Sequence, residues 1–261
     1  MRLLCASLLL SFLFIFSCAE KAATMEVEEE LPDPFASIDD AKAKELLMKA
    51  MEGAGGLEKW ESLSEISFDK HFALFKEDGA VEMDRNQTYI QRNRKTEEGL
   101  GLDKEKDVVY QLGPDLIQIS GDVNPQADAQ AIENSVLSAS FVISIPFKLL
   151  DEGAELSYDG TDQLEDGREV EVLKVVYKPD EYSNLSTADI WWHYFDAKTY
   201  KHLAYMVQHA DHVSYVENTG LTEAGGIVFP LTRKSWRVNE NREKLWLRAD
   251  YEYSNYTVNG E

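Results

Sequence analysis

The sequence predicts an α+β fold whose main element is a strongly curved antiparallel β-sheet or partial barrel. A helical pattern over residues 37–63 is followed by several strand-like stretches in which apolar and polar residues alternate. The stretch 244–258 alternates most cleanly, and long strands with one polar face are typical of antiparallel sheets that expose one face to water. The chain of 261 residues, 44% of them hydrophobic, is long enough to bury a core without disulfides or metals.

The domain is expected to begin with two helices. Ser37, with Asp40 three residues later, predicts the N-terminus of the first helix. That helix is expected to end at Gly53, and a shorter helix over residues 57–63 follows the glycine turn. The spacing predicts a buried face formed by Leu47, Ala50 and Met51.

Strands are expected in most of the remaining domain. They are rich in β-branched and aromatic residues, and we place them at residues 66–75, 108–112, 116–120, 168–177, 189–196 and 244–258. The first of these is expected to place on one face Ile66, Phe68, Phe72 and Leu74. The last is expected to place on one face Leu245, Leu247, Ala249, Tyr251 and Tyr253.

One segment, residues 125–150, departs from this pattern. It begins like a helix and then becomes apolar on nearly every side until Pro146, so it must be buried or must cover something apolar. Two interpretations are open: a core helix that plugs an open barrel, or a helix that lines a cavity for an apolar ligand. The second interpretation gives a set of candidate cavity residues: Val136, Phe141, Ile143, Ile145, Phe147 and Trp192.

The N-terminal region has the pattern of a bacterial lipoprotein precursor. Residues 1–17 contain an apolar run too short to span a membrane and typical of a signal peptide. Ile15-Phe16-Ser17-Cys18 resembles a lipobox, which predicts cleavage before Cys18 and a membrane anchor of acyl chains, such as palmitate, on its thiol. An ordinary signal peptide with an incidental cysteine, or an uncleaved anchor, is the alternative.

The acidic stretch after the cysteine is expected to be a flexible tether, residues 18–34, leading to a single domain over residues 35–261. Ala19 after the cysteine favours the outer membrane. The following acidic residues resemble export signals of surface-displayed lipoproteins, so the domain is expected to face the periplasm or the cell surface.

Charge and cysteine content exclude several functions. The chain has 26 Lys and Arg against 48 Asp and Glu, a net charge of −22, which disfavours binding to nucleic acid and electrostatic docking on anionic lipid. Cys5 and Cys18 are the two cysteines, so the domain has no disulfide and no cysteine-based zinc site.

No recognised catalytic or cofactor motif occurs in the sequence. His209 and His212 are the closest histidines, but in a strand they would point to opposite faces, which disfavours a metal site. We therefore expect no catalytic residues, no metal, no cofactor and no enzyme activity. If the protein were an enzyme, these two histidines would be the first candidates.

Several stretches, taken in order, resemble the LolA/LolB-like superfamily of lipoprotein carriers and receptors: GGLEKWESLSEISF, ISIPFKLLDEGAELSYDG, DGREVEVLKVVY, DIWWHYFDAKTYKHLAYM and GGIVFPLTRKSW. The resemblance covers most of residues 38–258. It implies a half-barrel closed by helices, with a hydrophobic cavity that accepts acyl chains, and it implies no catalytic residues. The expected function is a membrane-anchored lipoprotein that binds an apolar ligand. The alternative is a structural or interaction module of the same fold with a filled interior.

Overall fold

The computed structural model describes most of the domain expected from the sequence. Pro34–Glu261 form one compact unit. The described residues are 33–93, 108–112, 115–123, 136, 138–178, 189–239 and 241–260. The expected signal peptide, Cys18 and nearly all of the expected tether lie outside these residues.

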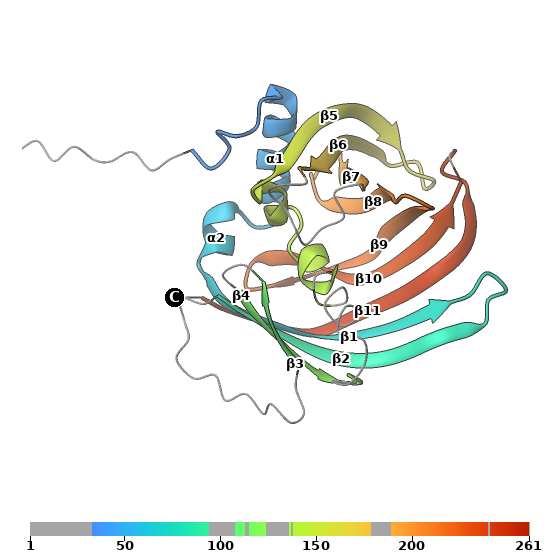
Figure 1. Ribbon diagram of the computed structural model, residues 1–261. Helices are drawn as coiled ribbons and strands as arrows, with labels where there is room; N and C mark the ends of the chain where they lie inside the picture. The colour runs from blue at the N-terminus through green and yellow to red at the C-terminus, as the bar shows by residue number, and fades with distance from the viewer. Residues whose placement is uncertain are drawn as a thin grey trace, which may run out of the picture. The chain divides into compact units, whose positions relative to one another are not determined.

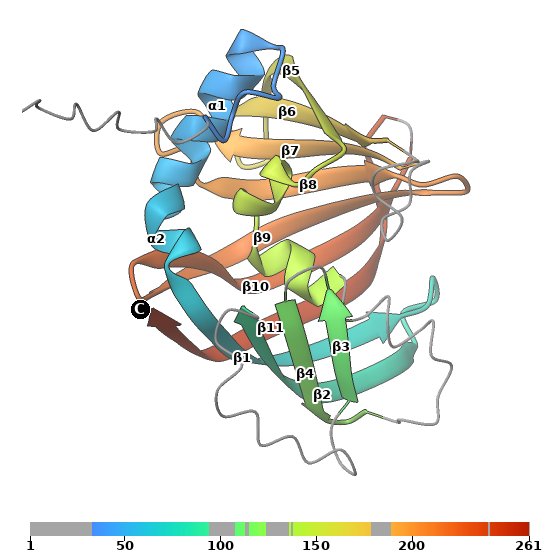
Figure 2. The same ribbon diagram turned by 60° about the vertical axis from the view of Figure 1, so that its left-hand side comes forward.

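The unit is built on one antiparallel sheet, in which the described strands follow the order β3-β4-β2-β1-β11-β10-β9-β8-β7-β6-β5. The sheet is strongly curved and is not closed, because β3 and β5 form its two edges (Figures 1 and 2). The curved antiparallel sheet is therefore confirmed. The strands are β1 (Leu63–Phe75), β2 (Val81–Asn93), β3 (Val108–Leu112), β4 (Asp115–Gly121), β5 (Ala154–Gln163), β6 (Glu169–Tyr177), β7 (Ile190–Asp196), β8 (His202–Gln208), β9 (Val213–Ala224), β10 (Ile227–Val238) and β11 (Lys244–Gly260).

Few helices accompany the sheet in the described part of the chain. They are α1 (Ala41–Gly53), α2 (Leu57–Glu61), a helical stretch over residues 138–143 and the 3-10 helix η2 (Phe147–Leu150). Figure 2 shows the last two, in yellow-green, within the curve of the sheet. No described helix is long and apolar enough to cross a membrane.

Helix α1 begins one turn later than the sequence predicted. Asp40, not Ser37, is the N-cap, and its carboxylate accepts hydrogen bonds from the backbone N–H groups of Lys42 (2.9 Å) and Ala43 (3.1 Å). The buried face of the helix is confirmed and is wider than predicted, comprising Ala43, Leu46, Leu47, Ala50 and Met51.

The glycine turn after α1 packs against the turn between β9 and β10. Gly55 has φ of +120°, and a Cβ there would lie 2.2 Å from the carbonyl oxygen of Gly226. The N–H of Val228 donates to the carbonyl of Ala54 at 2.9 Å. Only glycine permits this conformation and this close approach together.

The main core lies within the curve of the sheet, between the sheet, α1 and the segment of residues 138–150. In β1, Ile66 and Phe68 belong to this core as predicted; Phe72 is buried outside this cluster, and Leu74 is half-buried. The prediction for β11 holds only in part, because Leu245 is exposed where the strand extends beyond the core.

Candidate ligand-binding interior

Five of the six predicted cavity residues come together in the core. They are buried in one hydrophobic cluster and are Val136, Phe141, Ile143, Ile145 and Phe147. That these side chains contact a ligand stays a prediction.

Trp192 is placed elsewhere, which corrects the sequence-based assignment. It packs in a separate small cluster with Val172 and Tyr194, and its Nε1–H donates to the carboxylate of Asp159 at 2.9 Å. The neighbouring Trp191 takes the interior position instead, and contacts the core. Successive residues of a strand point to opposite faces, and β7 is covered on both faces, so the sequence pattern could not distinguish the two tryptophans.

The segment 138–150 is held in the hollow of the sheet chiefly by apolar and aromatic contacts. The ring of Phe141 lies 5.3 Å from that of Trp191, and Phe147 stacks on Trp60 of α2 with 4.6 Å between ring centroids. Ser140 donates a hydrogen bond to the side chain of Gln91 in β2 at 2.9 Å.

A small cavity remains behind this segment. It measures about 20 Å³ and is lined in part by Ala54, Val142, Ile145 and Phe229. A cavity of this kind needs about 10–15 Å³ to hold one water molecule, so this space has room for a water and is too small for an acyl chain. In the arrangement described, side chains fill this part of the interior.

The interior also contains a buried lysine that the sequence analysis did not identify. Lys70 of β1 is 5% exposed, and its ammonium lies over three aromatic rings: Phe72 at 4.9 Å, Tyr251 at 5.4 Å and Tyr89 at 5.6 Å. Burial, together with the positive charge of Arg233, lowers the pKa of Lys70 to about 7. Cation–π contacts therefore stabilise this ammonium in place of water.

Arg233 of β10 is the second buried cation, and is 3% exposed. Its guanidinium lies 5.3 Å from the ring centroid of Tyr205 and 5.7 Å from that of Tyr251, and donates to the hydroxyl of Tyr253 at 3.2 Å. Its Nε is buried without a hydrogen-bond partner. Burial acts to lower the pKa of Arg233, but the nearby tyrosines outweigh it and the pKa is raised, so the group stays charged.

Two neutral histidines, His193 and His202, lie near Tyr205, whose ring also contacts Arg233. His193 Nδ1 lies 3.3 Å from His202 Nε2, and both rings are near Tyr205. Burial lowers the pKa of His193 to about 3, and burial with the charges of His193 and Arg233 lowers that of His202 well below its usual value. The Nε2 atom of His193 is buried without a partner.

Register explains why these groups meet. In the antiparallel pairing Lys70 is opposite Tyr253, and Tyr251 is opposite Arg233. Tyr205 is opposite His193 two strands further on. The sequence did carry one signal, because Lys70 falls on the same alternation as Ile66 and Phe68. Tyr251 and Arg233, however, lie more than a hundred residues away from Lys70 in the chain.

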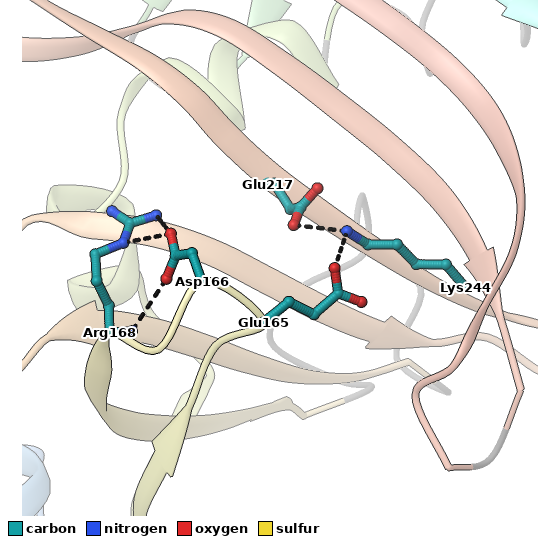
Figure 3. A network of polar contacts seen from close by, with 5 residues as sticks. All are labelled: Glu165, Asp166, Arg168, Glu217 and Lys244. Carbon is teal, nitrogen blue, oxygen red and sulfur yellow. Dashed lines mark hydrogen bonds and ion pairs between the residues drawn. The ribbon is translucent and has the colours of Figure 1, made fainter.

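Several cations elsewhere on the domain are paired with carboxylates. Figure 3 shows Lys244 between Glu165 (2.8 Å) and Glu217 (2.9 Å), and Arg168 paired with Asp166 at 2.6 Å. The two ion pairs of Lys244 connect the turn between β5 and β6 to β9 and β11. They contrast with Lys70 and Arg233, for which the described part of the chain supplies no Asp or Glu partner.

His209 and His212 do not lie on opposite faces of a strand, as the sequence suggested. They flank the turn between β8 and β9, with ring centroids 4.4 Å apart. Nδ1 of each is hydrogen bonded to a carboxylate, that of Asp189 at 2.9 Å and that of Asp211 at 2.6 Å. Among the described residues, no cluster of three or more His, Cys, Asp or Glu could hold a metal ion, and no hydroxyl pairs with either ring.

No protein-family model matches the chain, and no curated protein matches it. Among solved structures, a DUF1329 family protein from Desulfovibrio piger matches with a TM-score of 0.52 and 10% identity, over 83% of this chain and 93% of that one. A LolA superfamily protein from Nitrosomonas europaea gives 0.48 and 7% identity, over 84% and 94%. MucB in complex with MucA(peri) gives 0.23 and 12% identity, over 84% and 56%.

At these identities the similarity is one of fold alone. The chain shares the fold of the DUF1329 protein. Its open, strongly curved antiparallel sheet is the architecture that the sequence resemblance to the LolA/LolB-like superfamily implies. Function must be argued from the interior itself.

Proposed function

We propose that the protein is a lipid-anchored, non-enzymatic binding protein. Its half-barrel, closed by the helices, holds an apolar ligand, either a lipid or the acyl chains of a lipidated protein. The observation that supports this proposal is the segment 138–147, whose apolar side chains fill the hollow of an open sheet. In this proposal the segment, which is apolar on nearly every side and lies against the concave face, is a replaceable cover rather than a part of the sheet.

Ligand binding in this proposal requires the segment to move. Ligand pockets usually measure about 300–1,000 Å³, whereas the cavity behind Val142 and Ile145 measures about 20 Å³. An acyl chain that takes the place of Phe141 and Ile143 replaces one set of apolar contacts by another. The exchange therefore buries a similar apolar area and costs little hydrophobic free energy.

Hydrogen–deuterium exchange with and without dodecanoate tests this movement. We expect faster exchange of the backbone amides of residues 138–150 when dodecanoate is present, because the segment leaves the sheet. Exchange in β7 and β8 should stay unchanged, which serves as the control for global unfolding. Unchanged exchange in the segment, together with no binding of a fluorescent fatty acid, would contradict the proposal.

The filled interior supports a second candidate, an interaction module that contacts partners through its acidic surface. The small cavity and the net charge of −22 favour it. It predicts that the segment stays in place under all ligand conditions, so the same exchange experiment separates the two functions.

The anchor is proposed to be a set of acyl chains on Cys18 that holds the domain at the outer membrane. Cys5 provides a matched control, because it lies inside the apolar run that the signal peptidase removes. We expect Cys18→Ser to abolish incorporation of a palmitate analogue and to release the domain from the membrane fraction. Cys5→Ser should leave both unchanged. Equal labelling of the Cys18→Ser variant and the wild type would reject the lipobox.

A further inference from the structure

The least expected feature of the interior is a pair of buried cations for which the described residues provide no counter-ion. Lys70 and Arg233 share the ring of Tyr251, and no described carboxylate pairs with either. The chain has 48 acidic residues, and its surface cations Lys244 and Arg168 are paired with some of them. Inside the half-barrel, no described Asp or Glu neutralises Lys70 or Arg233 in this way.

A buried unpaired charge is costly, and the usual compensation is an opposite charge with hydrogen bonds. Arg233 cannot relieve the cost by losing its proton, since the guanidinium stays protonated in proteins. Aromatic faces and the hydroxyl of Tyr253 supply part of the compensation. These groups carry no full negative charge, so an anion would add the charge compensation that they lack.

Two buried hydrogen-bond donors in this part of the interior are unused, one on Arg233 itself and one on Trp191, which the ring of Tyr205 links to the guanidinium. Nε–H of Arg233 and Nε1–H of Trp191 are buried and have no partner. Tyr205 connects them, with its ring 5.4 Å from Trp191 and 5.3 Å from the guanidinium. His193, whose Nε2 is also without a partner, stacks on Trp191 with 6.1 Å between centroids. An oxyanion accepts several such hydrogen bonds at once.

We propose that the concave face holds an oxyanion-binding site formed by Lys70 and Arg233, with Tyr253 and Trp191 at its side. This inference rests on the proposed function and deepens it. The ligand is an amphiphile whose carboxylate or phosphate head contacts the two cations, and whose apolar chain takes the place of the segment around Phe141. A free oxyanion shares this chemistry, and the experiment below distinguishes it from a lipid head.

Photo-crosslinking on the full chain in lipid nanodiscs tests the site. The probes are dodecanoic acid and dodecanol, each with a diazirine near the methyl end, and inorganic phosphate is the competitor. We expect the acid to label the domain about tenfold more than the alcohol, as one charge-assisted hydrogen bond predicts. The labelled peptides should come from residues 138–150 or from β1, β10 and β11. Empty nanodiscs give the background.

Variants assign the preference to the two cations. Arg233→Gln and Lys70→Gln should each reduce labelling by the acid towards that of the alcohol, without lowering labelling by the alcohol. Lys234→Gln is the matched control, because it removes the next cation along β10, which is half-buried and points to the other face. It should keep the preference for the acid. Preserved labelling by the alcohol shows that each variant is folded.

The outcomes separate the two proposals. Equal labelling by acid and alcohol, unchanged in Arg233→Gln, overturns the oxyanion site and leaves the apolar-ligand function standing. Labelling by neither probe overturns the proposed function. In that case, thermal stabilisation of the wild type by millimolar phosphate that is lost in Arg233→Gln supports a site for a free oxyanion. If phosphate does not stabilise the wild type, the oxyanion site is overturned as well.

Discussion

Replacement of Lys70 by methionine should stabilise the protein, and should do so most at low pH. Methionine keeps most of the length of the side chain and removes the charge. Lys70 is buried among aromatic rings, and burial with the charge of Arg233 lowers its pKa to about 7 from 10.5. A lysine whose folded-state pKa is lowered destabilises the fold wherever the unfolded chain binds the proton more strongly.

The pKa difference sets the size and the pH window of the effect. One pKa unit corresponds to about 1.4 kcal/mol, so the charge costs about 5 kcal/mol at pH 6 and about 2 kcal/mol at pH 9. The cost is complete below the folded-state pKa and disappears as the pH rises through the unfolded-state value. The neighbouring Tyr251 and Tyr253 have raised pKa values and Arg233 stays charged, so none of them titrates in this window.

Urea unfolding at pH 6 and pH 9 measures the effect. The gain in free energy of unfolding from Lys70→Met should be larger at pH 6 than at pH 9 by about 3 kcal/mol. Lys174→Met is the matched control, because Lys174 lies over Trp192 on the other face of the sheet and should show no such pH dependence. A destabilisation by Lys70→Met of equal size at both pH values would refute the reasoning, because it would show that Lys70 has a counter-ion in the fold.

Three further predictions concern the fold that surrounds the site. Phe141→Ala should lower the free energy of unfolding by about 3–5 kcal/mol, because it leaves a cavity between the segment and the sheet; an unchanged urea midpoint would contradict the burial of this ring. Asp40→Ala should lower the urea midpoint and speed amide exchange in the first turn of α1, whereas the exposed Asp39→Ala should do neither. Gly79→Ala should lower the free energy of unfolding by about 1–2 kcal/mol, because of its positive φ alone. Gly55→Ala should lower it clearly more, because a Cβ there would also meet Gly226. Equal losses in the two variants would argue against this close approach.

Alternation is a local signal, and the strands placed from it correspond to six of the eleven described strands, whereas β2, β5, β8, β9 and β10 were not among them. The buried faces of α1 and β1 follow directly from the spacing of their apolar residues, and the burial of the segment around Phe141 follows from its apolar character on every side. The order of strands in the sheet was not predicted. Pairing between β1 and β11 joins residues about 180 positions apart, which no local pattern specifies.

The candidate site could be predicted only in part. Alternation assigns charged residues to the wet face, so a lysine on the apolar side of β1 was not recognised as buried. Its burial depends on rings from three strands, above all Tyr251, which only the fold brings to it. Trp192 was predicted in the interior where Trp191 lies, because both faces of β7 are covered and alternation does not distinguish them.

Native mass spectrometry of the full chain, released gently from nanodiscs after incubation with dodecanoate or dodecanol, tests the central claim most directly. We predict a one-to-one complex with dodecanoate that survives release, weaker retention of dodecanol, and loss of the difference in Arg233→Gln. A bare chain at saturating concentrations of both compounds would contradict the claim that the half-barrel holds an apolar ligand.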